Sequence, residues 1–227
     1  EQLLPLLVAM ARDPWLSQDQ FELERDLNLQ NLLRQREDPF QLAHDQLRGL
    51  LYGDGPYGHD ALGVEADLKA IGRLELKQLA SSYGRSGAVL VLAGELPAAA
   101  ERWLLSGLGG EAWPCSAPER QAGPTGLQQP KLACSNDDTE QLVLMLGAAT
   151  VPLGDPDGLA LRVLQAHLGM GMSSRLFVSL REERGLAYDV GVHLPARRGA
   201  TPFIWHLSTS ADRAAEATSA LLEEWQR

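Results

Sequence analysis

Apolar residues recur at helical spacing through most of the first hundred positions of the chain. The spacing predicts α-helices at five ranges, which are 2–12, 17–36, 40–51, 65–83 and 97–108. Ser17 and Gln20 have the spacing of a capping box at the start of the second helix. Residues 87–96 differ, because GAVLVLAGEL is a short continuous apolar run that predicts a buried strand.

The second half of the chain mixes two apolar patterns. Strands are predicted at 140–151, 186–194 and 201–210. Helices are predicted at 155–169 and 173–185, and a last helix carries Ala214, Ala217, Leu221 and Trp225 along one face. Gly185 is expected to end the second of these helices, because glycine adopts the left-handed conformation found at helix ends.

Residues 109–130 are rich in glycine and proline and show no periodicity. We interpret them as a linker between a first domain, 1–108, and a second domain, 131–227. Cys115 lies within this stretch and Cys134 just after it. The two cysteines can pair across the linker or remain two inert thiols, and they show no metal-ligand spacing.

Charge and hydropathy exclude some functions. The net charge of −10 disfavours binding to nucleic acid, whose phosphates require basic residues. No apolar run approaches the roughly 20 residues of a membrane span. The chain begins at Glu1 inside an apolar helical pattern, so we expect a fragment of a longer protein. A signal peptide would lie upstream, and the sequence therefore does not assign the cellular compartment.

The five histidines form no metal-binding motif in this sequence. His44-Asp45 and His59-Asp60 resemble the His-Asp pairs of metal-dependent phosphohydrolases, but no further histidine or aspartate at matching spacing completes a set. No His-x-x-x-His or His-x-x-Glu-His occurs. The remaining three, His167, His193 and His206, are interpreted as core, boundary or strand residues.

Arg181 and Tyr188 flank the predicted helix end at Gly185. Arginine offers a rigid fork of donors and tyrosine a hydroxyl donor, so both could stabilise a developing oxyanion. The spacing is equally compatible with an arginine favoured by the helix dipole and a tyrosine packed in a strand.

The segment MGMSSRLFVSLREERGLAYDVGV closely resembles the second domain of the pitrilysin/insulinase/mitochondrial-processing-peptidase family of M16-type zinc peptidases. QFELERDLNLQNLLRQREDP is similar to the family's helix with the third zinc ligand. EQLVLMLGAATVPLGDPDGLALRVLQAHLG is similar to the start of its second domain. The resemblance implies an α+β fold of two related domains, each with helices on a mainly antiparallel sheet, and a truncated first domain.

The resemblance also assigns the metal positions. The family's histidine ligands and general base belong to a His-x-x-Glu-His motif that would lie upstream of Glu1. The supporting glutamate of the family matches Glu24, and the ligand glutamate, seven residues on, matches Asn31. A neutral asparagine binds zinc far less well than a carboxylate, so we expect no metal or other cofactor in this chain.

Arg181 and Tyr188 match the family's substrate-contacting pair in identity and spacing. The resemblance therefore implies an inactive, non-zinc subunit that contacts a peptide carbonyl beside a zinc-bearing partner in a heterodimer. One alternative is an inert scaffold or core subunit of a larger complex. Another is a self-sufficient zinc metalloendopeptidase, if the match at Asn31 is misaligned.

Overall fold

The computed structural model describes residues 3–84, 86, 88–95, 98–109, 113, 127, 129–136, 139–152 and 154–227. The chain divides into two compact units. Unit 1 comprises Glu1–Gln30 and Val64–Gln121, and unit 2 comprises Asn31–Gly63 and Ala122–Arg227. No helix among these described residues is both long enough and apolar enough to cross a membrane.

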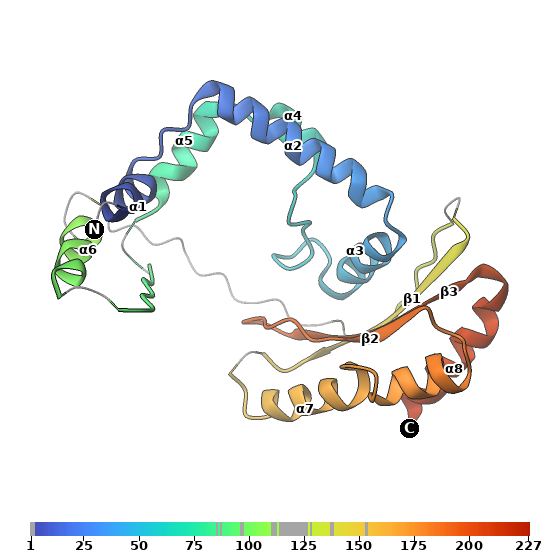
Figure 1. Ribbon diagram of the computed structural model, residues 1–227. Coiled ribbons are helices and arrows are strands. Elements are labelled where there is room, and N and C mark those ends of the chain that lie inside the picture. Colours follow the sequence, from blue (N-terminus) through green and yellow to red (C-terminus); the bar gives the residue numbers. More distant parts are fainter. Residues whose placement is uncertain are drawn as a thin grey trace. The chain divides into compact units, whose positions relative to one another are not determined.

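Unit 1 is helical. Its elements are α1 (Leu3–Arg12), the first part of α2 (Gln18–Arg36), α4 (Glu65–Ala70), α5 (Arg73–Ser82) and α6 (Ala98–Gly109). Helices α1 and α6 lie side by side (Figure 1), and the absence of a side chain at Gly107 lets Val8 approach closely. The guanidinium of Arg12 donates to the Gly107 carbonyl over 3.0 Å. The predicted cap of α2 also forms, because the Gln20 N–H donates to Ser17 Oγ over 3.3 Å.

Two predictions for unit 1 were wrong. The single helix expected over 65–83 is broken between α4 and α5, where Ile71 and Gly72 are extended. The Gly72 N–H donates to the Glu75 carboxylate over 3.1 Å, and this bond starts a new helix. The strand expected over 87–96 is also absent from residues 88–95, where Val89 is 84 % exposed. A strand needs a hydrogen-bonded neighbour, and the described part of unit 1 contains no other strand.

Unit 2 is built on an antiparallel sheet. Its strands are β1 (Gln141–Thr150), β2 (Asp189–His193) and β3 (Thr201–Ser210), and β3 lies in the centre. The register pairs Gln141 with Ser210 at one end of β1 and β3. Asp189 pairs with Ser208 in the neighbouring ladder. All three strands were predicted, although β2 is shorter than the expected range 186–194.

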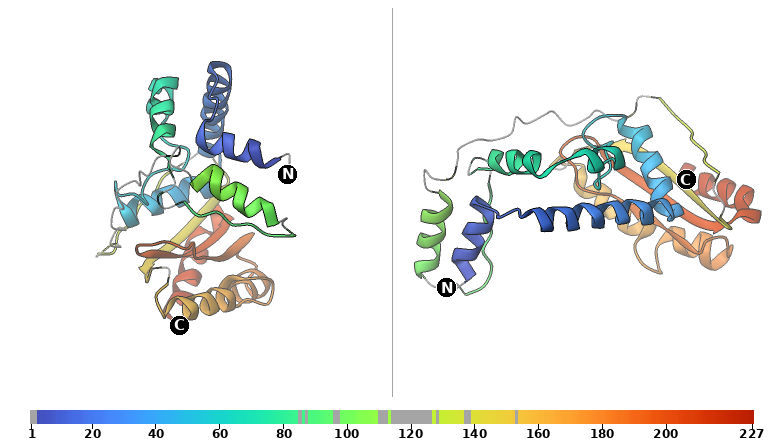
Figure 2. Two further views of the ribbon diagram at one scale, coloured as in Figure 1. Left: turned by 90° about the vertical axis from the view of Figure 1, so that its left-hand side faces the viewer. Right: turned by 90° about the horizontal axis from the view of Figure 1, so that it is seen from above.

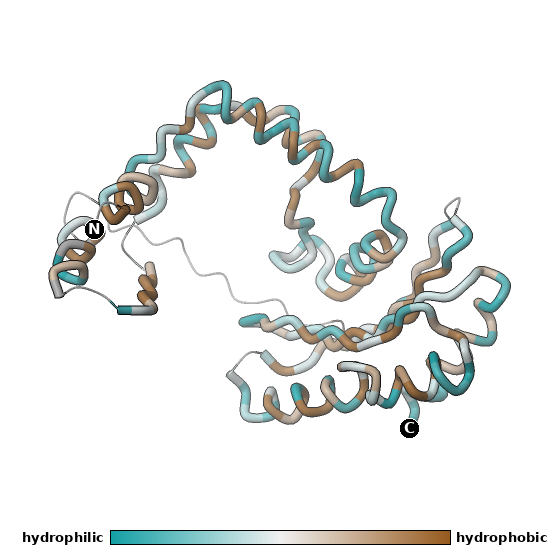
Figure 3. The backbone as a smooth tube through the Cα atoms, viewed as in Figure 1, coloured by the Kyte–Doolittle hydropathy of each residue, from teal (hydrophilic) through white to brown (hydrophobic). Residues whose placement is uncertain are grey.

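One face of the sheet carries the hydrophobic core. Alternate residues of β3 point to it, namely Phe203, Trp205 and Leu207. Helices α7 (Gly158–Gly169), η1 (Phe177–Glu183) and α8 (Ala214–Gln226) cover this face. Figure 3 shows brown, hydrophobic segments along both the strands and these helices. Leu180 and Leu221 are buried within it.

The opposite face of the sheet is covered by α3 (Pro39–Tyr52), which packs mainly on β1. Figures 1 and 2 both show α3 and α7 on opposite sides of the strands. Leu47 of α3 lies against Gly147, where a Cβ atom would come within 2.9 Å of the leucine methyl groups. Asp38 starts α3 by accepting a 2.9 Å hydrogen bond from the Phe40 N–H. Helices on an antiparallel sheet confirm the predicted α+β class.

The linker predicted over 109–130 lies mostly outside the described residues, and so does Cys115. Cys134 is an exposed free thiol. The domain limits 1–108 and 131–227 therefore stay a prediction.

Candidate functional site

The corner between η1 and β2 is shaped by Gly185. This glycine has a φ of +58°, and the Leu186 N–H donates to the Leu180 carbonyl over 2.8 Å. That bond closes the helix end as predicted. The seven residues before the corner adopt a π-helix rather than the expected α-helix. Short π-helical segments are often found at functional sites.

Arg181 lies in the last turn of η1 and is exposed. Its guanidinium carbon lies 4.9 Å from the centroid of the Phe177 ring, a cation–π contact that leaves the N–H groups free to donate. Among the described residues, its side chain has no hydrogen-bond or ion-pair partner.

Tyr188 immediately precedes β2 and is 66 % exposed. Its backbone N–H donates to the Ser208 carbonyl over 2.8 Å, which holds the main chain while the ring faces outward. The alternative of a tyrosine packed in a strand is therefore wrong. Within the described chain no hydrogen bond joins Tyr188 to Arg181, and their convergence on one ligand stays a prediction.

A buried acid holds the helix that carries Arg181. The Glu224 side chain is fully buried and accepts from Arg175 Nε over 2.8 Å and from Ser179 Oγ over 2.9 Å. Burial raises the pKa of this carboxyl, but the hydrogen bonds from Ser179 and Arg175 and the nearby positive charges outweigh burial and lower it. Helix η1 is thereby tied to α8.

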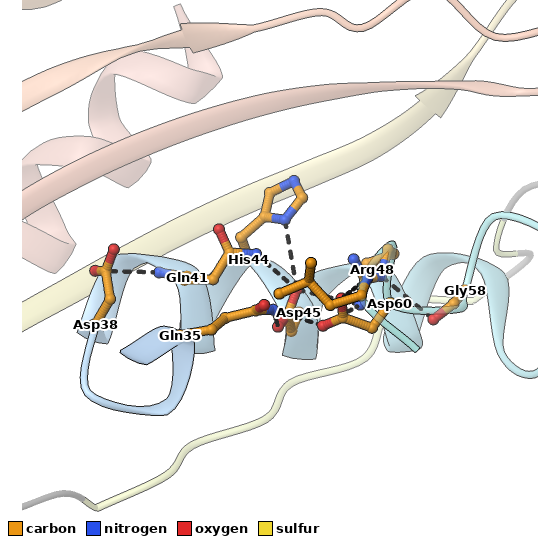
Figure 4. A network of polar contacts seen from close by, with 9 residues as sticks. Gln35, Asp38, Gln41, His44, Asp45, Arg48, Gly58 and Asp60 are labelled. Carbon is orange, nitrogen blue, oxygen red and sulfur yellow. Dashed lines mark hydrogen bonds and ion pairs between the residues drawn. The ribbon is translucent and has the colours of Figure 1, made fainter. Parts of the chain in front are cut away.

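A second polar cluster is formed by residues of α2, α3 and the loop after α3 (Figure 4). Arg48 Nη2 lies 3.2 Å from Asp45 Oδ1 and 3.5 Å from Asp60 Oδ2. Gln35 Nε2 donates to both carboxylates, over 2.7 Å to Asp45. Burial raises the pKa of Asp60, but the hydrogen bonds from the Leu62 N–H and Gln35, together with the charge of Arg48, lower it overall. Asp60 is therefore ionised at neutral pH.

These residues border an open cavity of about 370 Å³, whose lining also includes Asn31, Arg34 and Asp38. The structure brings together Asp45 and Asp60, the aspartates of the two His-Asp pairs. Both form ion pairs with Arg48. Sequence reasoning missed this role of Arg48. Its spacing of three residues from Asp45, which places both on one side of a helix, was the available signal.

The structure also corrects the predicted environments of the histidines. His167 was expected on a core or boundary face of α7, but it is exposed on the same side as Val163, itself 65 % exposed. His44 and His193 face each other across the α3–sheet contact, with ring centroids 6.3 Å apart. This pairing joins distant segments and leaves no local signal in the sequence.

Comparison with known proteins agrees with this architecture. Residues 73–227 match the family model described as "Peptidase M16 inactive domain". The chain belongs to the M16 peptidase family. An "uncharacterized zinc protease" of Mycobacterium leprae is 33 % identical over 180 residues, which are 76 % of this chain and 40 % of that protein. A homologue with the same description from Mycobacterium tuberculosis is 32 % identical over 82 % of this chain and 44 % of its own length.

Solved structures share the fold. A peptidase M16 inactive domain from Pseudomonas fluorescens has a TM-score of 0.86 and 25 % identity, covering 99 % of this chain and 56 % of that one. A Helicobacter pylori protease has a TM-score of 0.76 at 17 % identity over 98 % of this chain and 55 % of its own, a likeness of fold alone. This M16 chain thus spans about half the length of its relatives.

The zinc that the M16 family implies does not fit the residues of this chain. Asn31, at the expected ligand position, is exposed and shares its cavity with two arginines, which repel a cation. Asp60, the nearby ionised acid, is already paired with Arg48. Glu24 is exposed, and its carbonyl accepts from Asn28. No group of three or more histidine, cysteine or acidic residues suited to a metal ion occurs in the described ranges.

Proposed function

We propose that this chain is the non-zinc member of a two-subunit M16 peptidase, and that Arg181 and Tyr188 bind the carbonyl of the peptide to be cleaved. One observation carries the proposal. Both side chains are exposed donors with no polar partner among the described residues, and they stand on either side of the Gly185 corner.

The chemistry suits these two groups. Attack on a peptide carbonyl builds negative charge on its oxygen, and donors placed around that oxygen stabilise the transition state more than the ground state. Arginine brings a charged planar fork and tyrosine a neutral hydroxyl. The Phe177 ring restricts the guanidinium, which lowers the entropy lost when a peptide binds.

The partner would be an M16 homologue with the zinc ligands and general base, because Asn31 stands where this chain would need a carboxylate. The substrate would be a peptide whose carbonyl contacts Arg181 and Tyr188 beside the zinc of the partner. The net charge of −10 favours basic or unfolded segments.

The test is co-expression of the chain with a zinc-bearing homologue, followed by a peptide-cleavage assay. Arg181→Ala and Tyr188→Phe are each expected to lower kcat by about 10²–10³, the usual cost of losing one oxyanion donor. Arg184→Ala is the matched control, because it removes a guanidinium from the same helix end that is already paired with Glu223 over 3.0 Å. Tyr83→Phe removes a phenol that is exposed elsewhere.

Three results would contradict the proposal. Unchanged cleavage in both site variants would remove their catalytic role. Failure of every homologue to produce an active pair would favour an inert scaffold. Stoichiometric zinc and activity in the longer protein purified alone would indicate a self-sufficient peptidase.

A further inference from the structure

The α3-facing side of the sheet in unit 2 mixes apolar and titratable residues. It carries Gly147 on β1, Ile204 and His206 on β3, and Asp189, Gly191 and His193 on β2. The other side of the same strands is apolar. Titratable side chains therefore lie among small and apolar residues on a surface that a helix covers.

Three of the five histidines meet at this contact. The His44 ring of α3 lies edge-on to His193 of β2 at 6.3 Å between centroids. The Phe40 ring of α3 lies edge-on to His206 of β3 at 5.1 Å. An apolar ring against imidazole favours the neutral form, because a charged imidazolium would lose its hydration.

The two ring nitrogens of His206 differ in their polar contacts. Its Nε2 lies 3.2 Å from Asp189 Oδ2. Its Nδ1 is buried and has no hydrogen-bond partner in the described part of the chain. A neutral ring can leave Nδ1 as an unprotonated acceptor, whereas a protonated ring would bury an N–H donor without an acceptor.

We propose that these three histidines form an acid-sensitive contact, which holds α3 on the sheet at neutral pH and releases it on mild acidification. Protonation would place positive charges on both sides of the His44–His193 pair. The charged groups that face the cluster are Asp45, Arg48, Asp189 and Arg197. Two acids and two arginines leave no net negative charge to accommodate the new protons.

The pKa directions agree with this geometry. Burial lowers the pKa of His44, His193 and His206 below the ordinary value of 6.5. For His193 the neighbouring His44 and His206 lower the pKa further. A histidine whose pKa is lowered by folding binds its proton more readily when released, so the contact weakens as pH falls below about 6.5.

Release of α3 would also free the β2–β3 connection. Tyr52, the last residue of α3, donates its hydroxyl to the Ala200 carbonyl over 2.8 Å. Tyr57 Oη accepts from the N–H groups of Arg198 and Gly199 over 3.0 and 3.1 Å. These bonds join the end of α3 and the loop that follows it to the β2–β3 connection. Release of α3 in acid would therefore also loosen that loop and that connection.

The test is hydrogen exchange followed by mass spectrometry on the 227-residue chain at pH 7.5 and 5.5, corrected for intrinsic exchange. We expect protection of residues 39–52 to fall by up to roughly tenfold for each cluster histidine, because pH 5.5 lies about one unit below the ordinary pKa of 6.5. Protection of α8 should remain unchanged. Aspartate and glutamate carboxylates stay ionised over this range, so they do not produce the effect.

Two variants separate the cluster from the other histidines. The double variant His44→Gln, His193→Gln should lose most of the pH response of α3, whereas His59→Gln, His167→Gln should keep it. Unchanged α3 protection at pH 5.5, an equal loss in α8, or a full response in the double cluster variant would overturn the proposal.

A second measurement does not depend on how the variants fold. In the unsubstituted chain, NMR titration should show the three cluster rings protonating below pH 6.5, the ordinary pKa of histidine. Cluster rings that protonate at pH 6.5 or above would overturn the proposal.

Discussion

Arg175 and Glu224 form a buried ion pair across 49 residues of sequence, with 2.8 Å between Arg175 Nε and Glu224 Oε2. The glutamate side chain is fully enclosed, and the arginine side chain is 30 % exposed. This pair joins the start of the helix that bears Arg181 to the last helix of the chain. It therefore supports the corner that we assign to substrate binding.

Replacing Arg175 with methionine should destabilise the fold by about 3 kcal/mol, because the buried carboxylate loses the nearer of its two arginine partners and keeps only Arg227, at 3.2 Å. Chemical denaturation followed by Trp205 and Trp225 fluorescence would measure the change, since these two rings lie 4.8 Å apart in the same region. The control is Arg184→Met, which breaks the more exposed pair with Glu223 and should cost less than about 1 kcal/mol. Equal costs would contradict the assigned role of burial.

The Glu224 carboxylate also predicts a pH dependence. Folding lowers its pKa below the ordinary 4.5, so its stabilisation is fully present above that value and is lost as pH falls through the folded-state pKa. Glu224→Gln should therefore destabilise the chain at pH 7, and the difference from the unsubstituted chain should shrink as pH falls below 4.5. Urea unfolding at pH 7, 5, 4 and 3 would show it. A difference that stays constant with pH would count against the ionised carboxylate.

Two glycines of α7 should respond oppositely to alanine. A Cβ atom at Gly169 would overlap the backbone nitrogen of Val192, so Gly169→Ala should cost about 3 kcal/mol through overpacking and displacement of β2. A Cβ atom at Gly158 meets nothing within 4 Å, and Gly158→Ala should be neutral or stabilise by up to about 1 kcal/mol. Thermal unfolding of both variants would decide whether α7 packs this closely on β2.

Arg181→Ala and Tyr188→Phe should leave the fold intact. Both side chains are exposed, and exposed substitutions usually change stability by less than about 0.5 kcal/mol. Loss of the Phe177 contact can add about 0.5–1 kcal/mol for Arg181→Ala. A melting temperature within a few degrees of the unsubstituted chain would confirm that a catalytic loss reflects lost donors. A large drop would show that these residues support the fold.

Local signals predicted much of unit 2 correctly. The strands at 140–151 and 201–210 form within one residue of their expected limits, because their apolar patterns agree with their burial. Gly185 ends its helix for a local reason, its positive φ. The break at Gly72 was missed because the helical periodicity continues on either side of it.

The sequence by itself determined the family and the positions of most helices and strands, and it predicted that Asn31 stands at the position of a zinc ligand. These follow from residue types and short-range spacing. Only the tertiary structure decided that 88–95 forms no strand, that Arg48 binds both Asp45 and Asp60, and that three histidines meet beneath α3. Each of these depends on which distant segment is present to pack or to form a hydrogen bond, and short-range spacing carries no information about that choice.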